Sequence, residues 1–140
     1  MSGFLLDTNV ISELVRPEPD DKVRRWVEAT DESILFLSVL TLGEIRNGVQ
    51  RLRSGRRRAQ LESWLQADLP SRFEGRILPI DAAIADRWGT VSAIAAAKGK
   101  PVPVIDGLLA ATAIHHNLTL VTRNGADVGG TGVRTLNPWV

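Results

Sequence analysis

Four carboxylates in this 140-residue chain occupy positions where acidic side chains can do metal chemistry. Asp7 directly follows the apolar run at residues 4–6, and Glu44, Asp106 and Asp127 lie near comparable junctions between predicted strands and helices. Ligands of open α/β sheets bind in the crevice beyond the carboxyl ends of the strands, so acids at such junctions are well placed to meet one. We therefore predict that the four acids share one pocket and hold a divalent metal ion.

The available donor atoms indicate which ion the predicted site would bind. Two unit charges about 4 Å apart repel by about 4 kcal/mol at an effective dielectric constant near 20, so clustered carboxylates need a cation or a proton. Carboxylates, the amide oxygens of Asn9 and Asn124, the Thr8 hydroxyl and water form a hard donor set that suits Mg²⁺ or Mn²⁺. Such an ion acidifies a bound water and neutralises a leaving oxygen, so the predicted chemistry is phosphodiester hydrolysis.

Each acid also has a simpler explanation when it is taken alone. An acid near a helix N-terminus stabilises the helix by roughly 0.3 to 1 kcal/mol, and this explanation stays open for Asp106 and Asp127. Asp7 differs, because a carboxylate at the end of a buried strand needs a partner. Gly43 and Gly48 flank Glu44 and suggest close helix packing, which would hold Glu44 in a crowded cleft.

The elements that must position these acids are short strands separated by helices. Apolar runs predict strands at residues 4–6, 34–37, 75–80, 118–122 and 133–136, with a glycine-rich loop before the last. Helix caps are predicted at Thr8 or Asn9, at Asp20 or Asp21, at Ser38 and at Asp81, and Pro70 is predicted to end a helix. This alternation requires right-handed crossovers, so we predict a three-layer α/β/α domain with a parallel central sheet, spanning residues 1–140.

The composition narrows the class of protein. Apolar residues make up 44% of the chain and charged residues 24%, which fits one globular domain with a real core. A formal net charge of +1 means that any contact with nucleic acid must be local. The absence of cysteine excludes disulfides, thiolate zinc sites and cysteine nucleophiles. No signal-type or membrane-length apolar run occurs, so we expect a cytoplasmic protein with no membrane contact.

Four stretches of the sequence carry a resemblance to a known family. They are Leu5-Leu6-Asp7-Thr8-Asn9-Val10-Ile11-Ser12-Glu13, Leu42-Gly43-Glu44-Ile45-Arg46-Asn47-Gly48, Ile105-Asp106-Gly107-Leu108-Leu109-Ala110-Ala111-Thr112-Ala113 and Thr122-Arg123-Asn124. In this order they resemble the signature of PIN-domain ribonucleases, and more narrowly the VapC toxins of type II toxin–antitoxin systems. The stretches Gly75-Arg76-Ile77-Leu78-Pro79 and Leu136-Asn137-Pro138-Trp139 are most similar to the FitB branch.

The resemblance implies a PIN fold that cleaves RNA with magnesium, for which manganese is expected to substitute. Asp7, Glu44 and Asp106 match the acidic metal-site positions of the family. The fourth acidic position falls on Asn124 or Asp127, and we expect Asp127 because an amide cannot supply a negative charge. Polar groups expected around these carboxylates are Thr8, Asn9, Thr122 and Asn124. The continuation Val128-Gly129-Gly130 departs from the aromatic residue that is common after that aspartate.

The resemblance also implies partners. These are an RNA substrate, a small antitoxin whose C-terminal segment covers the crevice, promoter DNA bound through the antitoxin, and further copies of the chain in a homodimer or a higher assembly. The densest basic patch could contact RNA phosphates, and it comprises Arg51, Arg53, Arg56, Arg57 and Arg58. The simpler alternative for this patch is a solvated helix end with its loop.

Three other classes of protein can be weighed against this interpretation. A non-catalytic PIN-like module that binds nucleic acid within an antitoxin complex would keep the fold, and the intact acid set argues against it. A phosphoryl-transfer enzyme of the haloacid dehalogenase type would need a second aspartate where this chain has Asn9. A response-regulator receiver would need an aspartate on a middle strand and a late lysine, and neither is evident.

Overall fold

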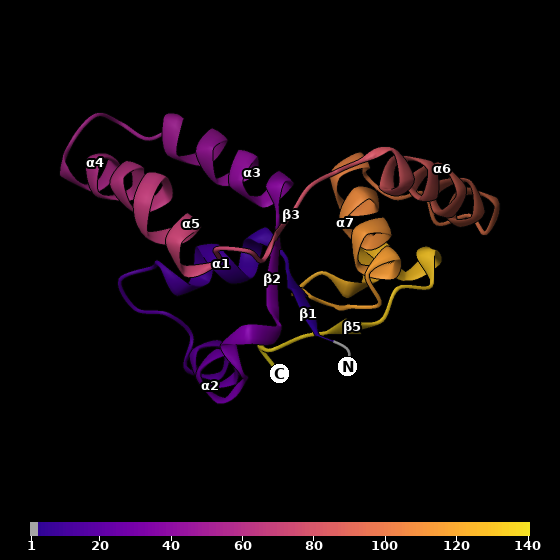
Figure 1. The fold of residues 1–140 in the computed structure, drawn as a ribbon, viewed down its shortest axis with the longest axis horizontal. Helices are drawn as coiled ribbons and strands as arrows, with labels where there is room; N and C mark the ends of the chain where they lie inside the picture. The colour runs from indigo at the N-terminus through magenta and orange to yellow at the C-terminus, as the bar shows by residue number, and fades with distance from the viewer. Residues whose placement is uncertain (1–2) are drawn as a thin grey trace.

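A parallel sheet of five strands forms the centre of residues 3–140, the part of the chain that the computed structural model describes (Figure 1). The strands are β1 (Phe4–Leu6), β2 (Leu35–Ser38), β3 (Ile77–Leu78), β4 (Thr119–Val121) and β5 (Thr135–Leu136). They lie in the order β3-β2-β1-β4-β5, and each neighbouring pair is parallel. The strand order reverses between β1 and β4, and this reversal is the switch point at which α/β sheets bind their ligands.

Helices cover both faces of this sheet, as Figure 1 shows. On one side lie α1 (Thr8–Leu14), α2 (Asp21–Ala29), α3 (Val39–Gln50), α4 (Arg56–Ser63) and α5 (Leu69–Arg72). On the other side lie α6 (Ala82–Ala97) and α7 (Val104–His115). The predicted three-layer α/β/α fold with a parallel sheet is therefore confirmed.

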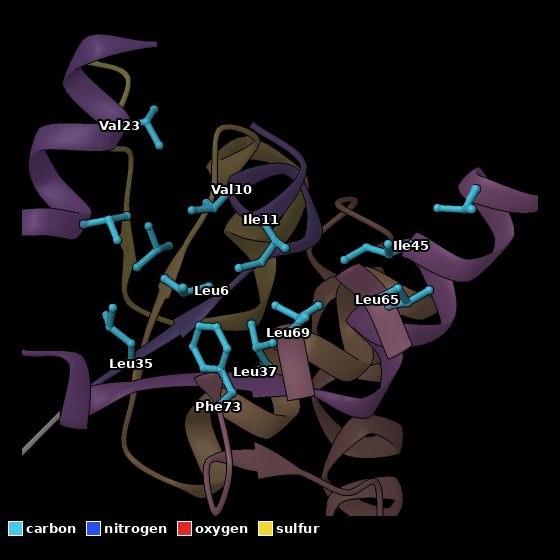
Figure 2. Packing of buried hydrophobic residues seen from close by; sticks show 13 residues of the cluster. Leu6, Val10, Ile11, Val23, Leu35, Leu37, Ile45, Leu65, Leu69 and Phe73 are labelled. Carbon is cyan, nitrogen blue, oxygen red and sulfur yellow. The ribbon is translucent and has the colours of Figure 1, made fainter. Parts of the chain in front are cut away.

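Alternate residues of the central strands supply two separate cores. Leu6 of β1 and Val121 of β4 belong to the core under α1–α5, whereas Leu5 and Leu120 belong to the core under α7. This split follows from the period of two along a strand, which sends successive side chains to opposite faces. Phe73, the largest of the fully buried side chains, lies in the first core (Figure 2). Both faces of β1 are thus buried, and the strand has little freedom to move.

Most helix starts follow the sequence prediction, with one correction. The predicted caps Asp20, Ser38 and Asp81 each accept a hydrogen bond from a backbone N–H of their helix. Helix α1 instead begins one residue earlier than predicted, so the prediction that it is capped by Thr8 or the next residue is wrong. The cap is Asp7, whose backbone is still extended and whose Oδ1 accepts from the Thr8 N–H at 2.7 Å. The strand passes directly into the helix at this acid.

The predicted helix end at Pro70 is also wrong. Helix α4 continues into the π-helical segment η2 (Trp64–Asp68) and then into α5. The N–H of Leu69 donates to the Trp64 carbonyl five residues earlier, and Pro70 follows in the first turn of α5. A wide π turn at this point relieves the clash between a proline ring and the carbonyl four residues before it, so the chain stays helical.

Two shorter segments complete the fold. A 3₁₀ helix, η1 (Glu32–Ile34), precedes β2, and a second, η3 (Gly125–Thr131), occupies the region predicted as a glycine-rich loop. Asn117 adopts the left-handed conformation just after α7, at φ 55°, a conformation that asparagine tolerates at helix ends. Among residues 3–140, none of the helices combines the length and the hydrophobicity needed to cross a bilayer.

Candidate functional site

Asp7 is held between the two strands at the switch point of the sheet. Its backbone N–H donates to the Val121 carbonyl of β4 at 2.9 Å, and its residue is only 9% exposed. The carboxylate bonds in two directions, because Oδ1 accepts from the Thr8 N–H at 2.7 Å while Oδ2 accepts from the Thr122 hydroxyl at 2.7 Å. These bonds satisfy a buried charged group and fix its orientation.

Thr122, just after β4, connects several of the predicted polar residues. Its hydroxyl donates to Asp7 and accepts the Asn124 N–H at 3.0 Å and the Asn9 Nδ2 at 3.4 Å. The Asn9 Nδ2 also lies 3.4 Å from Asp7 Oδ2, while its buried Oδ1 has no hydrogen-bond partner among the described residues. The side chains of Asn9 and Thr122 and the backbone of Asn124 therefore lie around Asp7.

Glu44 reaches the site from the second turn of α3. Its Oε1 accepts from the Thr8 hydroxyl at 2.5 Å, and that hydroxyl lies 3.3 Å from the hydroxyl of the fully buried Thr41. Sequence reasoning missed Thr41, although its place three residues before Glu44 puts both on one helix face. Thr8 therefore links Glu44 to Asp7, because its N–H donates to the aspartate and its hydroxyl donates to the glutamate.

The close helix packing predicted around Glu44 is wrong. A β-carbon added at either of its neighbouring glycines, Gly43 or Gly48, would meet no atom within 4 Å, and both glycines are exposed. Glu44 itself is only half-buried. Small residues in a helix permit close approach but do not require it, and here this stretch of α3 borders an open groove.

Asp106, in the first turn of α7, completes the acidic neighbourhood. Burial raises the pKa of its carboxyl above the ordinary value, and the negative charges of Asp7, Asp127 and Glu44 raise this pKa further. Asp127 lies exposed in the first turn of η3, with its N–H donating to the Asn124 carbonyl at 3.0 Å. The fold thus brings the four acids near enough to one another for the other three to affect the protonation of Asp106.

These residues suit a hydrated divalent ion better than a fully protein-bound one. Within residues 3–140, no three acidic or histidine side chains are arranged to ligate a single ion together. Mg²⁺ usually keeps several of its waters and is bound by one or two carboxylates, so it does not require such a ready set. The repulsion felt by Asp106 is the property that a cation at this place would relieve.

A groove leads away from the acids along one side of the molecule. It has a volume of about 240 Å³ and runs between α1, α3 and α4, with Thr8 and Glu44 among its lining residues. Its other lining residues are mostly apolar, and they include Val15, Ile45, Val49, Leu52, Leu61 and Trp64. Arg57 also lines the groove, and its Nη2 donates to the Val15 carbonyl at 2.7 Å.

The five arginines of the basic patch differ in how much they are already engaged. Arg58 pairs with Glu62 at 3.0 Å and donates to the Leu52 carbonyl, so part of its charge is neutralised within α4. The others are exposed, and no carboxylate of residues 3–140 lies within 4.0 Å of them; they are Arg51, Arg53, Arg56 and Arg57.

Sequence reasoning also missed a buried acid behind the site. Glu13, in the last turn of α1, is 4% exposed and accepts from Arg16 at 3.2 and 3.3 Å and from the Asp20 N–H at 3.0 Å. Arg123 approaches the same carboxylate at 3.9 Å, and its guanidinium stacks on the Trp139 ring at 4.2 Å from the centroid. The signal was present, because Val10 and Ile11 mark the inward face of α1 and Glu13 follows Val10 by three residues.

Comparisons with known proteins agree with this geometry. Residues 4–126 match the family model described as the PIN domain. Toxin FitB of Neisseria gonorrhoeae is 38% identical over 136 residues, which cover 97% of this chain and 98% of FitB. VapC ribonuclease Y4jK of Sinorhizobium fredii is 36% identical and covers 97% of each chain. A solved structure of FitAB bound to an IR36 DNA fragment contains a chain that is 36% identical, with a TM-score of 0.93 over 98% of this chain and 96% of that one. As its motifs predicted, the chain therefore belongs to the PIN-domain family and, within it, to the VapC ribonuclease toxins related to FitB.

Proposed function

We propose that this chain is a metal-dependent endoribonuclease and the toxin of a type II toxin–antitoxin pair. The observation that carries the proposal is the shared placement of the acids, because Thr8 binds Asp7 through its N–H at 2.7 Å and Glu44 through its hydroxyl at 2.5 Å. Burial raises the pKa of Asp106, and the nearby charges of Asp7, Asp127 and Glu44 raise this pKa further. Carboxylates that repel one another at the switch point of a parallel sheet are expected of a cation site. The family supports the same conclusion, since its members include a protein named VapC ribonuclease and another named Toxin FitB.

In this proposal Asp7, Glu44 and Asp106 hold the metal, in part through its bound waters, and Asp127 supplies the fourth carboxylate. PIN-domain ribonucleases generally need a divalent metal. We infer that the ion is Mg²⁺, with Mn²⁺ able to substitute, because every ligand on offer is an oxygen. When bound, such an ion supplies Lewis acidity and a water of lowered pKa for attack on a phosphodiester.

The remaining polar residues orient these acids. Thr122 and the N–H of Thr8 fix the two oxygens of Asp7, and the Thr8 hydroxyl fixes Glu44. Asn9 and Asn124 complete the network around the Thr122 hydroxyl. Two acids from distant parts of the chain are therefore held at defined places before substrate arrives, which lowers the reorganisation that the reaction requires.

The exposed arginines are proposed to bind the RNA backbone. Arg51, Arg53 and Arg56 have no carboxylate partner among residues 3–140, so their charge is available to phosphates. Replacing Arg53 and Arg56 by alanine should raise the KM for RNA and leave kcat unchanged. The salt dependence of binding should fall by about one unit of log–log slope for each phosphate that the variant no longer binds. An unchanged KM would favour the solvated-surface alternative.

The partners and setting follow from the family. We propose that a small antitoxin binds this chain and carries promoter DNA, a role supported by the FitAB relative, which was solved on a DNA fragment. We further propose that residues 1–140 form one PIN domain, that it assembles as a homodimer or a larger complex, and that it acts in the cytoplasm.

RNA cleavage with added Mg²⁺ tests the proposal. Wild type should cleave, chelation by EDTA should abolish cleavage, and Mg²⁺ or Mn²⁺ should restore it. Asp106→Asn should be inactive, whereas Asp86→Asn, which changes an exposed aspartate of α6, should cleave as wild type does. Equal cleavage by wild type and Asp106→Asn would reject the assigned site. No cleavage by either folded protein with metal present would favour the non-catalytic nucleic-acid-binding module.

A further inference from the structure

Helix α1 and the segment after β4 are joined at two places. At the first, the Thr122 hydroxyl donates to Asp7 at the start of the helix, at 2.7 Å. At the second, Arg123 approaches Glu13 in the last turn of the same helix, at 3.9 Å. Glu13 follows Asp7 by six positions, which is about 9 Å along the helix axis. One contact would let the segment pivot on Asp7, whereas two contacts this far apart fix its direction.

At the second of these two contacts, the buried Glu13 binds guanidinium groups. Its side chain is 5% exposed, so its negative charge needs positive partners. Two arginines supply them, Arg16 from the end of α1 and Arg123 from the segment beside the site. Arg16 contacts both carboxylate oxygens and stays within its own turn of chain, whereas Arg123 alone ties Glu13 to the segment that carries Thr122.

Trp139 holds the Arg123 side chain from the other end of the chain. The guanidinium carbon lies 4.2 Å from the centre of the indole ring, within cation–π range. The ring itself packs against the core under α1–α5, so it is a fixed surface. Arg123 is still half-exposed, and its position therefore depends on these two partners rather than on burial.

We propose that Arg123 is a positioning residue of the nuclease. Its bridge from Glu13 to Trp139, here called the Arg123 latch, holds Thr122 and Asn124 against Asp7 and fixes where η3 and its Asp127 begin. The consequence for catalysis rests on the proposed metal site, whereas the effect of the latch on the segment does not. Loss of the latch should loosen residues 122–124, weaken the binding of a divalent ion and lower kcat, without changing the KM for RNA.

Arg123→Met and Arg16→Met form a matched pair that tests the latch in the full chain. Each removes one guanidinium from Glu13, but only the first opens the latch. Amide hydrogen exchange, followed by NMR in the absence of metal, gives the exchange rates of two backbone N–H groups. The Asn124 N–H donates to the Thr122 hydroxyl and reports on the segment, whereas the Leu120 N–H lies inside the sheet and serves as the reference. Arg123→Met should speed Asn124 exchange relative to Leu120 by about five- to tenfold. Arg16→Met should lower the melting temperature and leave this ratio within about twofold of wild type.

Mn²⁺ binding, followed by electron paramagnetic resonance without RNA, is the second measurement. Arg123→Met should weaken Mn²⁺ binding by a factor similar to the exchange effect, and Arg123→Lys should fall between it and wild type, because an ammonium keeps the charge but does not stack. If Arg123→Met does not fold, Trp139→Leu makes the same test, since it removes the ring on which Arg123 stacks and leaves both arginines of Glu13 in place.

The outcomes separate the latch from the proposed function. If the ratio of the Asn124 to the Leu120 exchange rate is no larger in Arg123→Met than in Arg16→Met, the latch is overturned, regardless of the effect on Mn²⁺ binding. A raised ratio in a protein whose wild type binds no Mn²⁺ upholds the latch and rejects the metal site. A higher KM for RNA with an unchanged exchange ratio would make Arg123 a contact for RNA phosphates and overturn the positioning role.

Discussion

The hydrogen bond from Thr122 to Asp7 is the contact whose removal tests the site most directly. Thr122 is 2% exposed, and its hydroxyl lies 2.7 Å from Asp7 Oδ2. Replacement by valine keeps the shape of the side chain and removes the donor. The oxygen then keeps only the longer contact from Asn9 at 3.4 Å. A hydrogen bond to a charged group contributes about 1.5 to 3 kcal/mol, so Thr122→Val should lower the free energy of unfolding by about 2 to 3 kcal/mol.

Urea unfolding in EDTA measures this loss, and Thr122→Ser is its control. Serine keeps the hydroxyl and lacks one methyl group, which predicts a loss of only about 1 kcal/mol. A double-mutant cycle with Asp7→Ala isolates the bond, because the lost helix cap affects both arms of the cycle equally. The coupling energy should be about 2 kcal/mol. The reasoning is refuted if Thr122→Val costs no more than Thr122→Ser, or if the coupling energy is near zero.

Two further predictions concern α7. The raised pKa of Asp106 means that the fold disfavours its charged form. The resulting loss of stability is absent below pH 3.8, grows as the pH rises from 3.8 to the raised pKa, and is constant above it. Without metal, Asp106→Asn should therefore melt higher than wild type at pH 7 and lose this advantage near pH 3; a constant difference across this range would contradict the pKa shift. Gly107→Ala would place a β-carbon 3.0 Å from Nε1 of Trp88 and should cost about 1 to 3 kcal/mol in urea unfolding. At Gly89, an added β-carbon would meet no atom within 4 Å, so Gly89→Ala should instead raise the free energy of unfolding by up to about 1 kcal/mol. Equal effects at both glycines would show that helix propensity, and not the contact with Trp88, determines the change in stability.

The placement of the acids was predictable because it depends on topology. Asp7 follows an apolar run, and Asp106 comes early in a helix that precedes another strand, so the parallel sheet brings both to the same edge. Those statements need only the order of the elements. The caps of α2, α3 and α6 were predictable for a related reason, since a cap is decided within three or four residues.

The side-chain partners were not predictable, because each joins residues far apart in the sequence. The bond between Thr122 and Asp7 spans 115 residues, and the bond between Thr8 and Glu44 spans 36. No local pattern specifies such a pair. The wrong inference at Gly43 has the same origin, because whether a glycine is packed against depends on what the rest of the fold places beside it.

Asp7 and Asp106 differ in the groups that surround their carboxylates. Asp7 has two strong donors from the protein, and its Oδ1 accepts only the Thr8 N–H, so this oxygen has a further lone pair that can bind an ion while both bonds are kept. Among residues 3–140, Asp106 accepts no hydrogen bond, and only burial and neighbouring negative charge act on its pKa. Asp7 is therefore held in place by donors from the protein, whereas Asp106 has no such donor and gains most from an added cation. The stabilisation that a bound ion gives to the fold should accordingly depend on Asp106 more than on Asp7.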